Sequence, residues 1–473
     1  MSTPTLIPTP TCDLKFIRRA SRAGVWCACA LPLVLVGCGD STVTPNGDQT
    51  PALCNGLPAQ VLTGRIEQDR RLTADQRWLL SGQVQVTNRA TLTIDAGTTI
   101  CGDATDPTRV SFLNIDQDAK LIADGTREKP IVFTSSNPVG SRKTSDWGGV
   151  VLRGRGPINL PPGNENACGS LEGNAGSYGP CGTLRADDNS GTLRYVRIEF
   201  AGREVAPDNE LNGLTLGAVG SGTTIDYVQV HRGSDDAFEM FGGTVNLRHL
   251  VATGGLDDAF DWDQGWSGKG QFWVSQQISQ DGNNGIEADN NRDNNGLLPR
   301  SNPTVYNITL IGTGRGSAPK GEKRYGMTLR QGTDGHIYNA IVHGFADKGI
   351  VISQDSTCAE LSANRLSIVS SVFWDNGGDS AGNVSDITKV GTTACDVKTW
   401  ALSAGSAEKD PMLRRPYDTA SPDFRPSSGS PMLTGGATPP TNDTFFTAVP
   451  YIGALGDTDS DNWVAGWTAF PAN

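Results

Sequence analysis

The sequence predicts an all-β fold, a parallel β-helix in which a single chain winds into stacked coils. The first observation is a repeated turn. Asp235-Asp236-Ala237-Phe238 returns 22 residues later as Asp257-Asp258-Ala259-Phe260, and 26 residues further on as Asn283-Asn284-Gly285-Ile286. A period near 24 residues with the same polar-polar-small-apolar pattern is typical of a solenoid. The second observation is that short alternating apolar runs, cut by Gly, Asn, Asp and Pro, begin at about residue 61, whereas helical periodicity is scarce.

The first residues are typical of an export signal. Arg18, Arg19 and Arg22 form a basic segment, and the apolar run over residues 25–36 follows it. This run is shorter than the roughly 20 residues that a membrane-spanning helix needs. The sequence therefore predicts an exported protein.

The end of this segment, Leu35-Val36-Gly37-Cys38, resembles the lipobox of bacterial lipoproteins. The resemblance implies a signal peptide over residues 1–37 and a lipidated Cys38 that opens a flexible tether over residues 38–60. Gly39 stands where an Asp would imply retention at the inner membrane, so the resemblance implies an outer-membrane anchor. The alternative is an ordinary cleaved signal peptide.

The cysteines beyond Cys38 agree with export. Six of the chain's ten cysteines remain, and an even number in an oxidising compartment predicts three disulfides. Among the 15 connectivities that six cysteines allow, we favour three local pairs: Cys54–Cys101, Cys168–Cys181 and Cys358–Cys395. A zinc site is disfavoured because no C-x-x-C or Cys/His cluster occurs.

The charge balance excludes some partners. The chain carries 39 basic and 51 acidic residues, and removal of the signal segment makes it more acidic still. A nucleic-acid partner needs a basic face, and so does electrostatic docking on anionic lipid. An acidic polysaccharide would need a local basic patch or bridging cations.

The expected strands follow one another along the chain. The early ones lie in residues 91–100, 112–122, 130–134 and 147–152, each with apolar side chains on alternate positions. Residues 154–192 break this rhythm and carry Cys168 and Cys181, so we expect an insertion between two coils. Insertions in solenoids often form the binding face.

After the insertion two registers are visible. Small residues align at Gly213, Ala237, Ala259, Gly285, Gly326 and Gly349, with spacings of 24, 22, 26, 41 and 23 residues. The longest spacing leaves room for a loop near residues 313–324. A second register runs through residues 225–230, 247–251, 305–310, 337–342 and 369–373. Asn307 and Asn339 occupy matching places in it and predict an internal amide ladder between coils.

These turns, such as Asn212-Gly213-Leu214, resemble the right-handed parallel β-helix of the pectin-lyase superfamily. The phrases DWGGVVLRG, LRYVRIEFAG and DDAFDWDQGWSG further resemble a family of bacterial surface lipoproteins that includes a spirochaetal outer-membrane lipoprotein. The resemblance covers about residues 60–473. It implies a single-stranded right-handed β-helix at a cell surface, and it implies no activity.

We expect the β-helix to span residues 61–405 and a capping segment to span residues 406–473. The tail is rich in Pro and aromatic residues. A terminal unit of a solenoid must cover an open sheet edge and core, so a cap is favoured over a separate binding domain.

The acidic turns predict a cation site. Consecutive coils stack about 4.8 Å apart, so carboxylates at equivalent positions repel unless they are protonated, solvated or bound to a cation. A hard cation with oxygen ligands, Ca²⁺ by default, suits them, although no EF-hand-type loop occurs. The predicted ligands lie on one face of the stacked strands or in the turn that precedes each strand: Asp236, Glu239, Asp258, Asp261, Asp263, Glu287 and Asp289. The alternative is that Asp and Asn are simply turn residues.

A catalytic hypothesis uses Asp235, Asp236, Asp257 and Asp258. Gly233-Ser234-Asp235-Asp236 resembles the Asp-Asp turn of polygalacturonase-type glycosidases, in which paired carboxylates act as acid and base. Their Gly-His-Gly and Arg-x-Lys motifs are missing here, and a catalytic pair is needed only once, whereas this turn is repeated. A lyase would need a base such as Arg232, Arg248 or Lys269 beside Ca²⁺.

Aromatic residues flank the second acidic turn. Phe238 and Phe260 are expected in the core, whereas Trp262 and Trp266 either stack on a sugar or fill the core. Our first hypothesis is a lipid-anchored, non-enzymatic surface protein whose acidic, cation-binding face binds a glycan or a protein. The alternative is a polysaccharide-active enzyme, a polyuronate hydrolase or lyase.

Overall fold

The computed structural model describes residues 52–206, 209–278, 282–315, 324–377 and 395–473. The predicted signal peptide, Cys38 and the first part of the tether lie outside these residues, as does most of the loop expected at 313–324. Within the described ranges, no helix combines the length and the apolar character that crossing a membrane requires.

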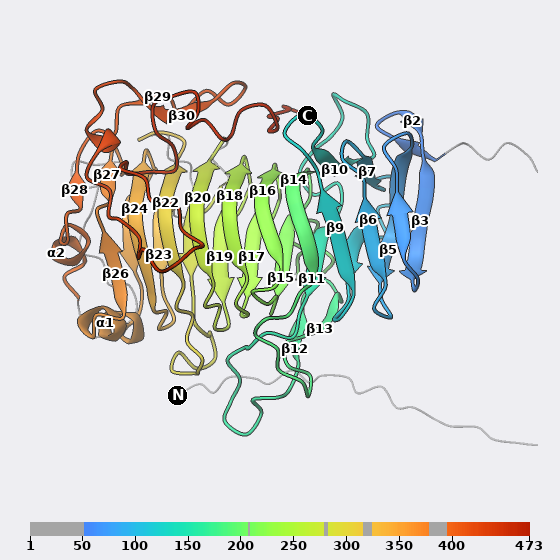
Figure 1. Cartoon of the computed structure of the whole chain (residues 1–473), viewed down its shortest axis with the longest axis horizontal. Helices are drawn as coiled ribbons and strands as arrows, with labels where there is room; N and C mark the ends of the chain where they lie inside the picture. Colours follow the sequence, from blue (N-terminus) through green and yellow to red (C-terminus); the bar gives the residue numbers. More distant parts are fainter. Residues whose placement is uncertain (1–51, 207–208, 279–281, 316–323, 378–394) are drawn as a thin grey trace, which may run out of the picture. The chain divides into compact units, whose positions relative to one another are not determined.

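The described chain forms a parallel β-helix, as predicted. Its main sheet has 24 strands, from β3 (Gln60–Ile66) to β28 (Ala407–Glu408) without β12 (Gly169–Leu171) and β13 (Gly176–Tyr178). These strands stack along the solenoid in Figure 1. One face stacks short strands: β8 (Phe112–Ile115), β11 (Gly149–Arg153), β15 (Leu214–Gly217), β17 (Phe238–Phe241), β19 (Phe260–Asp263), β21 (Ile286–Ala288), β23 (Tyr325–Leu329) and β25 (Lys348–Ile352).

The other two faces share long strands: β14 (Gly191–Glu199), β16 (Thr224–His231), β18 (Asn246–Thr253), β20 (Lys269–Gln276), β22 (Thr304–Ile311) and β24 (Gly335–His343). Shorter strands continue each of these two faces beyond the long strands. The face that contains the first halves of the long strands is continued by β4 (Arg70–Leu72), β6 (Thr91–Ile94), β9 (Lys120–Asp124) and β26 (Leu366–Val369). The face that contains the second halves is continued by β7 (Thr99–Gly102), β10 (Ile131–Ser135) and β27 (Val372–Trp374). Strand β5 (Arg77–Val86) pairs with both β7 and β8.

Each long strand contains one non-glycine residue with a positive φ. In β14 it is Tyr195 at 51°, and in β16 it is Tyr227 at 56°. The ladder between β14 and β16 skips this pair and resumes on its far side. The left-handed residue thus divides the strand: the first half of β14 pairs with β9 and the second half with β10. The second register that the sequence predicts is thus divided between two faces of the solenoid.

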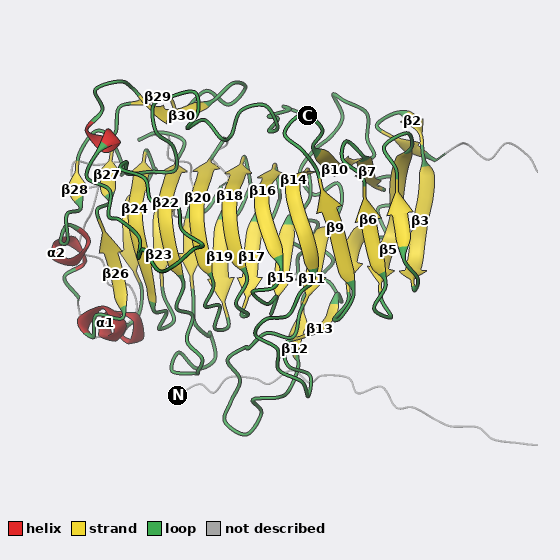
Figure 2. Ribbon diagram, in the orientation of Figure 1, coloured by secondary structure: helices red, strands yellow, loops and turns green. Residues whose placement is uncertain are grey.

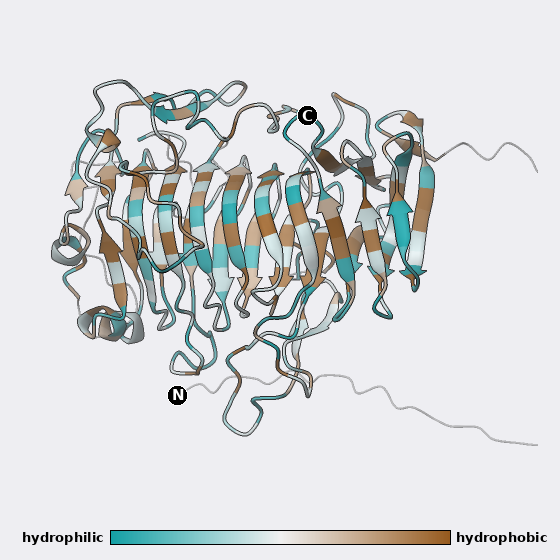
Figure 3. Ribbon diagram, viewed as in Figure 1, coloured by the Kyte–Doolittle hydropathy of each residue, from teal (hydrophilic) through white to brown (hydrophobic). Residues whose placement is uncertain are grey.

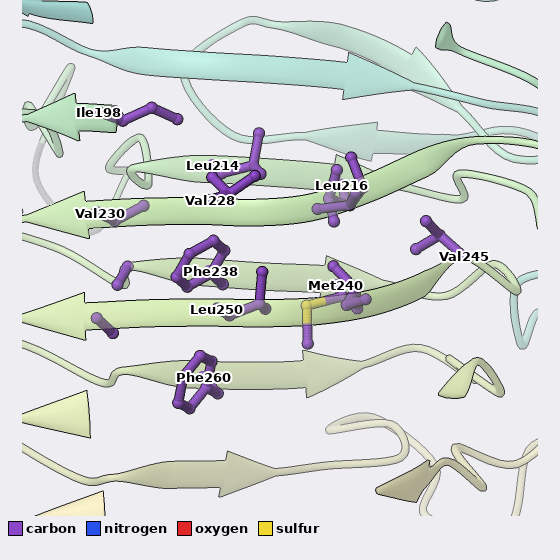
Figure 4. Packing of buried hydrophobic residues seen from close by; sticks show 14 of the residues in the cluster. Ile198, Leu214, Leu216, Val228, Val230, Phe238, Met240, Val245, Leu250 and Phe260 are labelled. Carbon is purple, nitrogen blue, oxygen red and sulfur yellow. The ribbon is translucent and has the colours of Figure 1, made fainter. Parts of the chain in front are cut away.

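The predicted coil alignment is confirmed by the register. Leu214, Phe238, Phe260, Ile286 and Met327 face one another in successive coils. Their side chains point into the solenoid with those of the opposite strands, as Figure 4 shows for Phe238, Phe260 and Leu250. Apolar and polar residues alternate along the strands in Figure 3, as expected for strands with one buried side.

The aromatic side chains follow the core prediction. Phe238 and Phe260 are fully buried, with ring centroids 5.6 Å apart. Trp262 and Trp266, whose place the sequence left open, are also buried in this core. They are therefore packing residues and offer no surface for a sugar.

The three predicted disulfides are present. Cys54–Cys101 joins the hairpin of β1 (Leu53–Cys54) and β2 (Leu57–Pro58) to β7. Cys168–Cys181 closes the insertion between β11 and β14, which carries the hairpin β12 (Gly169–Leu171) and β13 (Gly176–Tyr178). Cys358–Cys395 joins α1 (Asp355–Ser362) to the start of the segment that holds α2 (Val397–Ala401). Figure 2 shows both helices at the end of the solenoid where β26–β28 lie.

The C-terminal segment lies along the side of the solenoid. After β29 (Leu413–Arg415), β30 (Asp423–Pro426) and a 3₁₀ turn at Pro431–Leu433, residues 437–473 form a strap over the long strands. Gln229 donates to the carbonyl of Ala469 and accepts from its N–H, at 2.8 and 3.0 Å. Gln271 does the same with Thr447, at 2.7 and 2.8 Å.

The predicted amide ladder between Asn307 and Asn339 is wrong, because the side-chain amides of both residues donate to the strap. Asn307 accepts from Gln271 of the neighbouring coil, but its amide donates to the carbonyls of Tyr451 and Gly453 in the strap. Asn339 likewise bonds Ala437. Both asparagines are the left-handed residues of their strands, with φ of 59° and 58°, so their side chains leave the pairing pattern and reach the strap.

Candidate functional site

The acidic residues form a grid on the outside of the short-strand face. Glu239, Asp261 and Glu287 face one another on β17, β19 and β21. Asp263 and Asp289 stand two positions further on, as expected for side chains that alternate between two faces. We call the following set the acidic patch: Asp235, Asp236, Glu239, Asp257, Asp258, Asp261, Asp263, Glu287 and Asp289. Thr215 precedes it on β15 and Thr328 follows it on β23.

The second aspartate of each turn bonds the backbone of the next coil. Asp236 accepts from the N–H of Asp258 at 3.0 Å, and Asp258 accepts from the N–H of Asn284 at 2.5 Å. Asn284 continues the row by accepting from the N–H of Tyr325 at 3.3 Å. The turn-residue alternative is thus partly right, but these side chains satisfy the backbone of the neighbouring coil instead of their own.

The carboxylates lie within metal-binding distance of one another. Three triads have ligand atoms that all lie within 4.8 Å of each other: Asp235, Asp236 and Asp257; Asp236, Glu239 and Asp261; and Asp258, Asp261 and Glu287. Five of the seven predicted metal ligands belong to these triads. Asp235 and Asp257, which the sequence suggested only as catalytic groups, join them. Asp263 and Asp289 lie outside the triads.

A pocket of about 240 Å³ opens over the patch. Glu239, Asp261, Asp263 and Asp289 line it, whereas Asp235, Asp236, Asp257 and Asp258 do not. The four candidate catalytic residues therefore lie beside the pocket. Their catalytic role stays a prediction.

The walls of the pocket come from outside the repeat. Glu172 of the insertion lines it, as do residues 291–293 after β21. Asn159, also in the insertion, donates to the carbonyl of Asn290 at 2.7 Å and accepts from the side chain of Asn291 at 3.0 Å. These hydrogen bonds fix the insertion against the loop that forms the opposite wall.

Arg330 neutralises one end of the patch. Its Nε donates to both carboxylate oxygens of Asp289, at 2.8 and 2.9 Å, and its guanidinium also pairs with Glu287. Burial alone would lower the pKa of Arg330, but these carboxylates together outweigh it and raise the pKa above its usual value. Arg292 also lines the pocket and is exposed.

Burial and mutual repulsion disfavour ionisation of the patch. Burial, followed by the charge of neighbouring carboxylates, raises the pKa of Asp236, Asp258 and Asp261 well above its usual range. Burial likewise raises the pKa of Asp235 and of Asp263 to about 7. Without a cation, the patch must hold protons that an ordinary surface carboxylate releases near pH 4.

The donor set fits a hard divalent cation. Every group in the three triads offers carboxylate oxygen, the ligand that Ca²⁺ prefers. The Oδ1 atom of Asp261 is buried and has no hydrogen-bond partner among the described residues. An unsatisfied buried carboxylate oxygen is costly, and coordination to a cation would satisfy it.

The sequence analysis missed the residues that come from distant positions. Glu172 and Arg292 lie in segments without a repeat, so no spacing relates them to the patch. The sequence could have identified Arg330, because this residue stands two positions after Thr328, which aligns with Glu287 in the register. Two of the basic residues suggested for a lyase lie elsewhere: Lys269 pairs with Asp443, and Arg248 packs over Phe445, both in the strap.

The family model of the pectate-lyase-like β-helix domain matches residues 64–413. Among solved structures, the crystal structure of pectate lyase Pel9A is similar, with 13% sequence identity and a TM-score of 0.36. The similarity covers 85% of this chain and 86% of that chain. No curated protein matches the sequence.

Proposed function

Because the chain belongs to the family of pectate-lyase-like β-helix domains, we propose that its parallel coils serve as a scaffold for cation binding at the acidic patch. The bound cation, Ca²⁺ by default, would be presented to a glycan or protein partner at the pocket. The observation that carries this proposal is the set of carboxylate triads with ligand atoms within 4.8 Å. Asp236, Glu239, Asp258, Asp261 and Glu287 would hold the cation, together with Asp235 and Asp257.

A binding role accounts for the patch better than a catalytic one. Among the residues that the structure describes, Arg330 is the basic group that forms ion pairs with the patch, and its pairs with Asp289 and Glu287 keep it protonated. The described lining of the pocket holds no lysine or histidine. The possible proton acceptors at the pocket are therefore its carboxylates, and the proposed cation would engage two of them, Glu239 and Asp261, as ligands.

The cation would also recruit an acidic partner. The patch repels an acidic polysaccharide while it is unneutralised, whereas a bound divalent cation offers open coordination positions to a carboxylate of the partner. Arg292 is exposed at the same pocket and adds a positive charge. A glycan or a surface protein with acidic groups is the partner class that this arrangement supports.

A second candidate function is a polysaccharide-active enzyme, either a polyuronate hydrolase or a lyase. One observation favours it: the pocket combines four carboxylates of the acidic patch with the exposed guanidinium of Arg292. Assays on a panel of polyuronates test it. Measurable turnover that is lost in Asp236→Asn would support the enzyme and overturn the non-enzymatic function.

We place the protein at the outer membrane, attached through a lipid on Cys38. The lipobox-like sequence supports this location. Membrane fractionation and intact-mass analysis of the wild type and Cys38→Ser test it. We expect a mass increase from the lipid that Cys38→Ser abolishes, and unchanged processing in the variant would contradict the anchor.

Calorimetric titration of Ca²⁺ into EDTA-treated, dialysed protein tests the cation site. We expect saturable binding that Asp261→Asn weakens at least tenfold, because Asp261 belongs to two of the three triads. Asp187→Asn is the matched control, since this exposed aspartate lies outside the patch. Absence of Ca²⁺ binding to the wild type would overturn the proposal.

A further inference from the structure

We propose that the acidic patch binds two divalent cations at the same time. One site consists of Asp235, Asp236 and Asp257, and the other of Asp258, Asp261 and Glu287. This inference rests on the proposed function, because it requires that the patch binds cations at all. It adds the number of cations and the division of the ligands between them.

The two triads share no residue, so each can be filled while the other is occupied. The remaining triad takes Asp236 from the first site and Asp261 from the second, and adds Glu239. Glu239 therefore stands between the two sites. Its carboxylate lies within 4.8 Å of a ligand atom of each site, where its negative charge would reduce the mutual repulsion of the two cations.

A neutral oxygen is available at each end of this row. Asn212 is 4% exposed and donates to Glu239, and its Oδ1 has no hydrogen-bond partner among the described residues. Gln331 is 6% exposed and lines the pocket with Asp261, and its Oε1 is likewise without a partner in the described chain. Buried amide oxygens are normally bonded, and Ca²⁺ accepts them as ligands. Asn212 precedes the first site by one coil, and Gln331 follows the second by one.

The charge of the patch also favours more than one cation once its carboxylates are ionised. Its nine carboxylates occupy three consecutive coils, and Arg330 pairs with two of them, Glu287 and Asp289. One divalent cation compensates two further charges and leaves repulsion between neighbouring coils. A second cation at the opposite end of the row reduces the repulsion between those carboxylates that the first cation does not contact.

The repeat supplies ligands to both sites. The first site takes Asp235 and Asp236 from one copy of the turn and Asp257 from the next. The second site takes Asp258 and Asp261 from that next copy and Glu287 from the coil after it. Duplication of a turn in a solenoid duplicates its ligands one coil further along. Each site therefore spans two consecutive coils, and three consecutive acidic coils hold both sites.

The number of bound cations tests this inference. Native mass spectrometry of the purified protein, titrated with Ca²⁺, is expected to show two bound ions at saturation. Asp235→Asn/Asp257→Asn and Glu287→Gln are each expected to retain one ion, and the combination of all three substitutions none. Circular dichroism establishes that each variant is folded, and Asp187→Asn serves as the control that keeps two.

The outcomes separate this inference from the proposed function. One ion on the wild type overturns the two-site inference and leaves cation binding intact. No ion overturns both. Two ions that persist in both the Asp235→Asn/Asp257→Asn and the Glu287→Gln variants overturn the assignment of residues. The number of ions bound to the wild-type protein is measured without any substitution, so this test stays valid even if a variant does not fold.

Discussion

The carboxylate of Asp236 accepts a hydrogen bond from the main-chain N–H of Asp258, its equivalent one coil later, at 3.0 Å. Asp258 repeats this contact with Asn284. The repeated turn thus has a structural purpose, because each second aspartate satisfies a buried backbone donor of its neighbour. Asp236 and Asp258 also belong to the carboxylate triads. The structural hydrogen bonds and the proposed cation binding therefore use the same side chains.

Replacement of Asp258 by Ala is expected to destabilise the protein by about 1–3 kcal/mol, the cost of leaving the buried N–H of Asn284 without an acceptor. Asp258→Asn keeps an oxygen acceptor and removes a charge, so its stability should equal or exceed that of the wild type. Urea denaturation in EDTA at pH 5 measures both. Equal stability of the two variants would contradict the structural role of this hydrogen bond.

The sequence predicted the parts of this site that repeat. The spacing of Ala237, Ala259 and Gly285 places Glu239, Asp261 and Glu287 in one column, as the register confirms. It could not predict the walls of the pocket, because Glu172 and Arg292 lie in non-repeating segments whose path depends on tertiary contacts. The contact between Asn159 and Asn290, 131 residues apart, is such a contact.

Stability of the metal-free protein should fall as pH rises from 5 to 8.5. The pKa of Asp235, Asp263 and Glu287 is raised to about 7 in the folded state, chiefly by burial, whereas unfolded carboxyls titrate near 4. Between these values the folded state binds more protons, so the free energy of unfolding decreases with pH.

This pH dependence is measured by thermal unfolding in EDTA across the range. Saturating Ca²⁺ should raise the melting temperature most at the alkaline end, because the cation replaces the lost protons. A melting temperature that rises with pH in EDTA would show that the carboxylates are ionised without a cation.

The strap should detach locally when its aromatic anchor is removed. Trp467 is 1% exposed and packs edge-on against Tyr195 and Tyr227, at 5.8 and 6.0 Å between ring centroids. Truncation of a buried Trp costs about 3–5 kcal/mol. We expect Trp467→Ala to increase amide exchange in residues 437–473 and to leave β17 and β19 protected.

Val139→Ala is the control for this experiment, since Val139 is 70% exposed. Exchange that increases equally in the strap and in β17 would contradict a separately docked strap. The strap itself escaped prediction for a physical reason. Its contacts are made by side chains such as Gln229 and Gln271, which bind the backbone of the strap and leave no pattern in its sequence.

Removal of Arg330 should change stability and cation affinity in opposite directions. Its guanidinium bonds both oxygens of Asp289 and pairs with Glu287, so Arg330→Gln leaves these carboxylates without a counter-charge. Because the side chain is 35% exposed, we expect a loss of about 1–2 kcal/mol in EDTA, below the cost of a fully buried pair. The affinity for Ca²⁺ should rise at least threefold, because the guanidinium no longer competes for Glu287.

Arg330→Lys is the matched variant, since it keeps the charge but cannot form the bidentate contact. Its Ca²⁺ affinity should lie between those of the wild type and Arg330→Gln. Unfolding in EDTA and calorimetric titration measure the two quantities on the same samples. A decrease of both in Arg330→Gln would mean that Arg330 orients Glu287 for the cation, and competition between guanidinium and cation would be wrong.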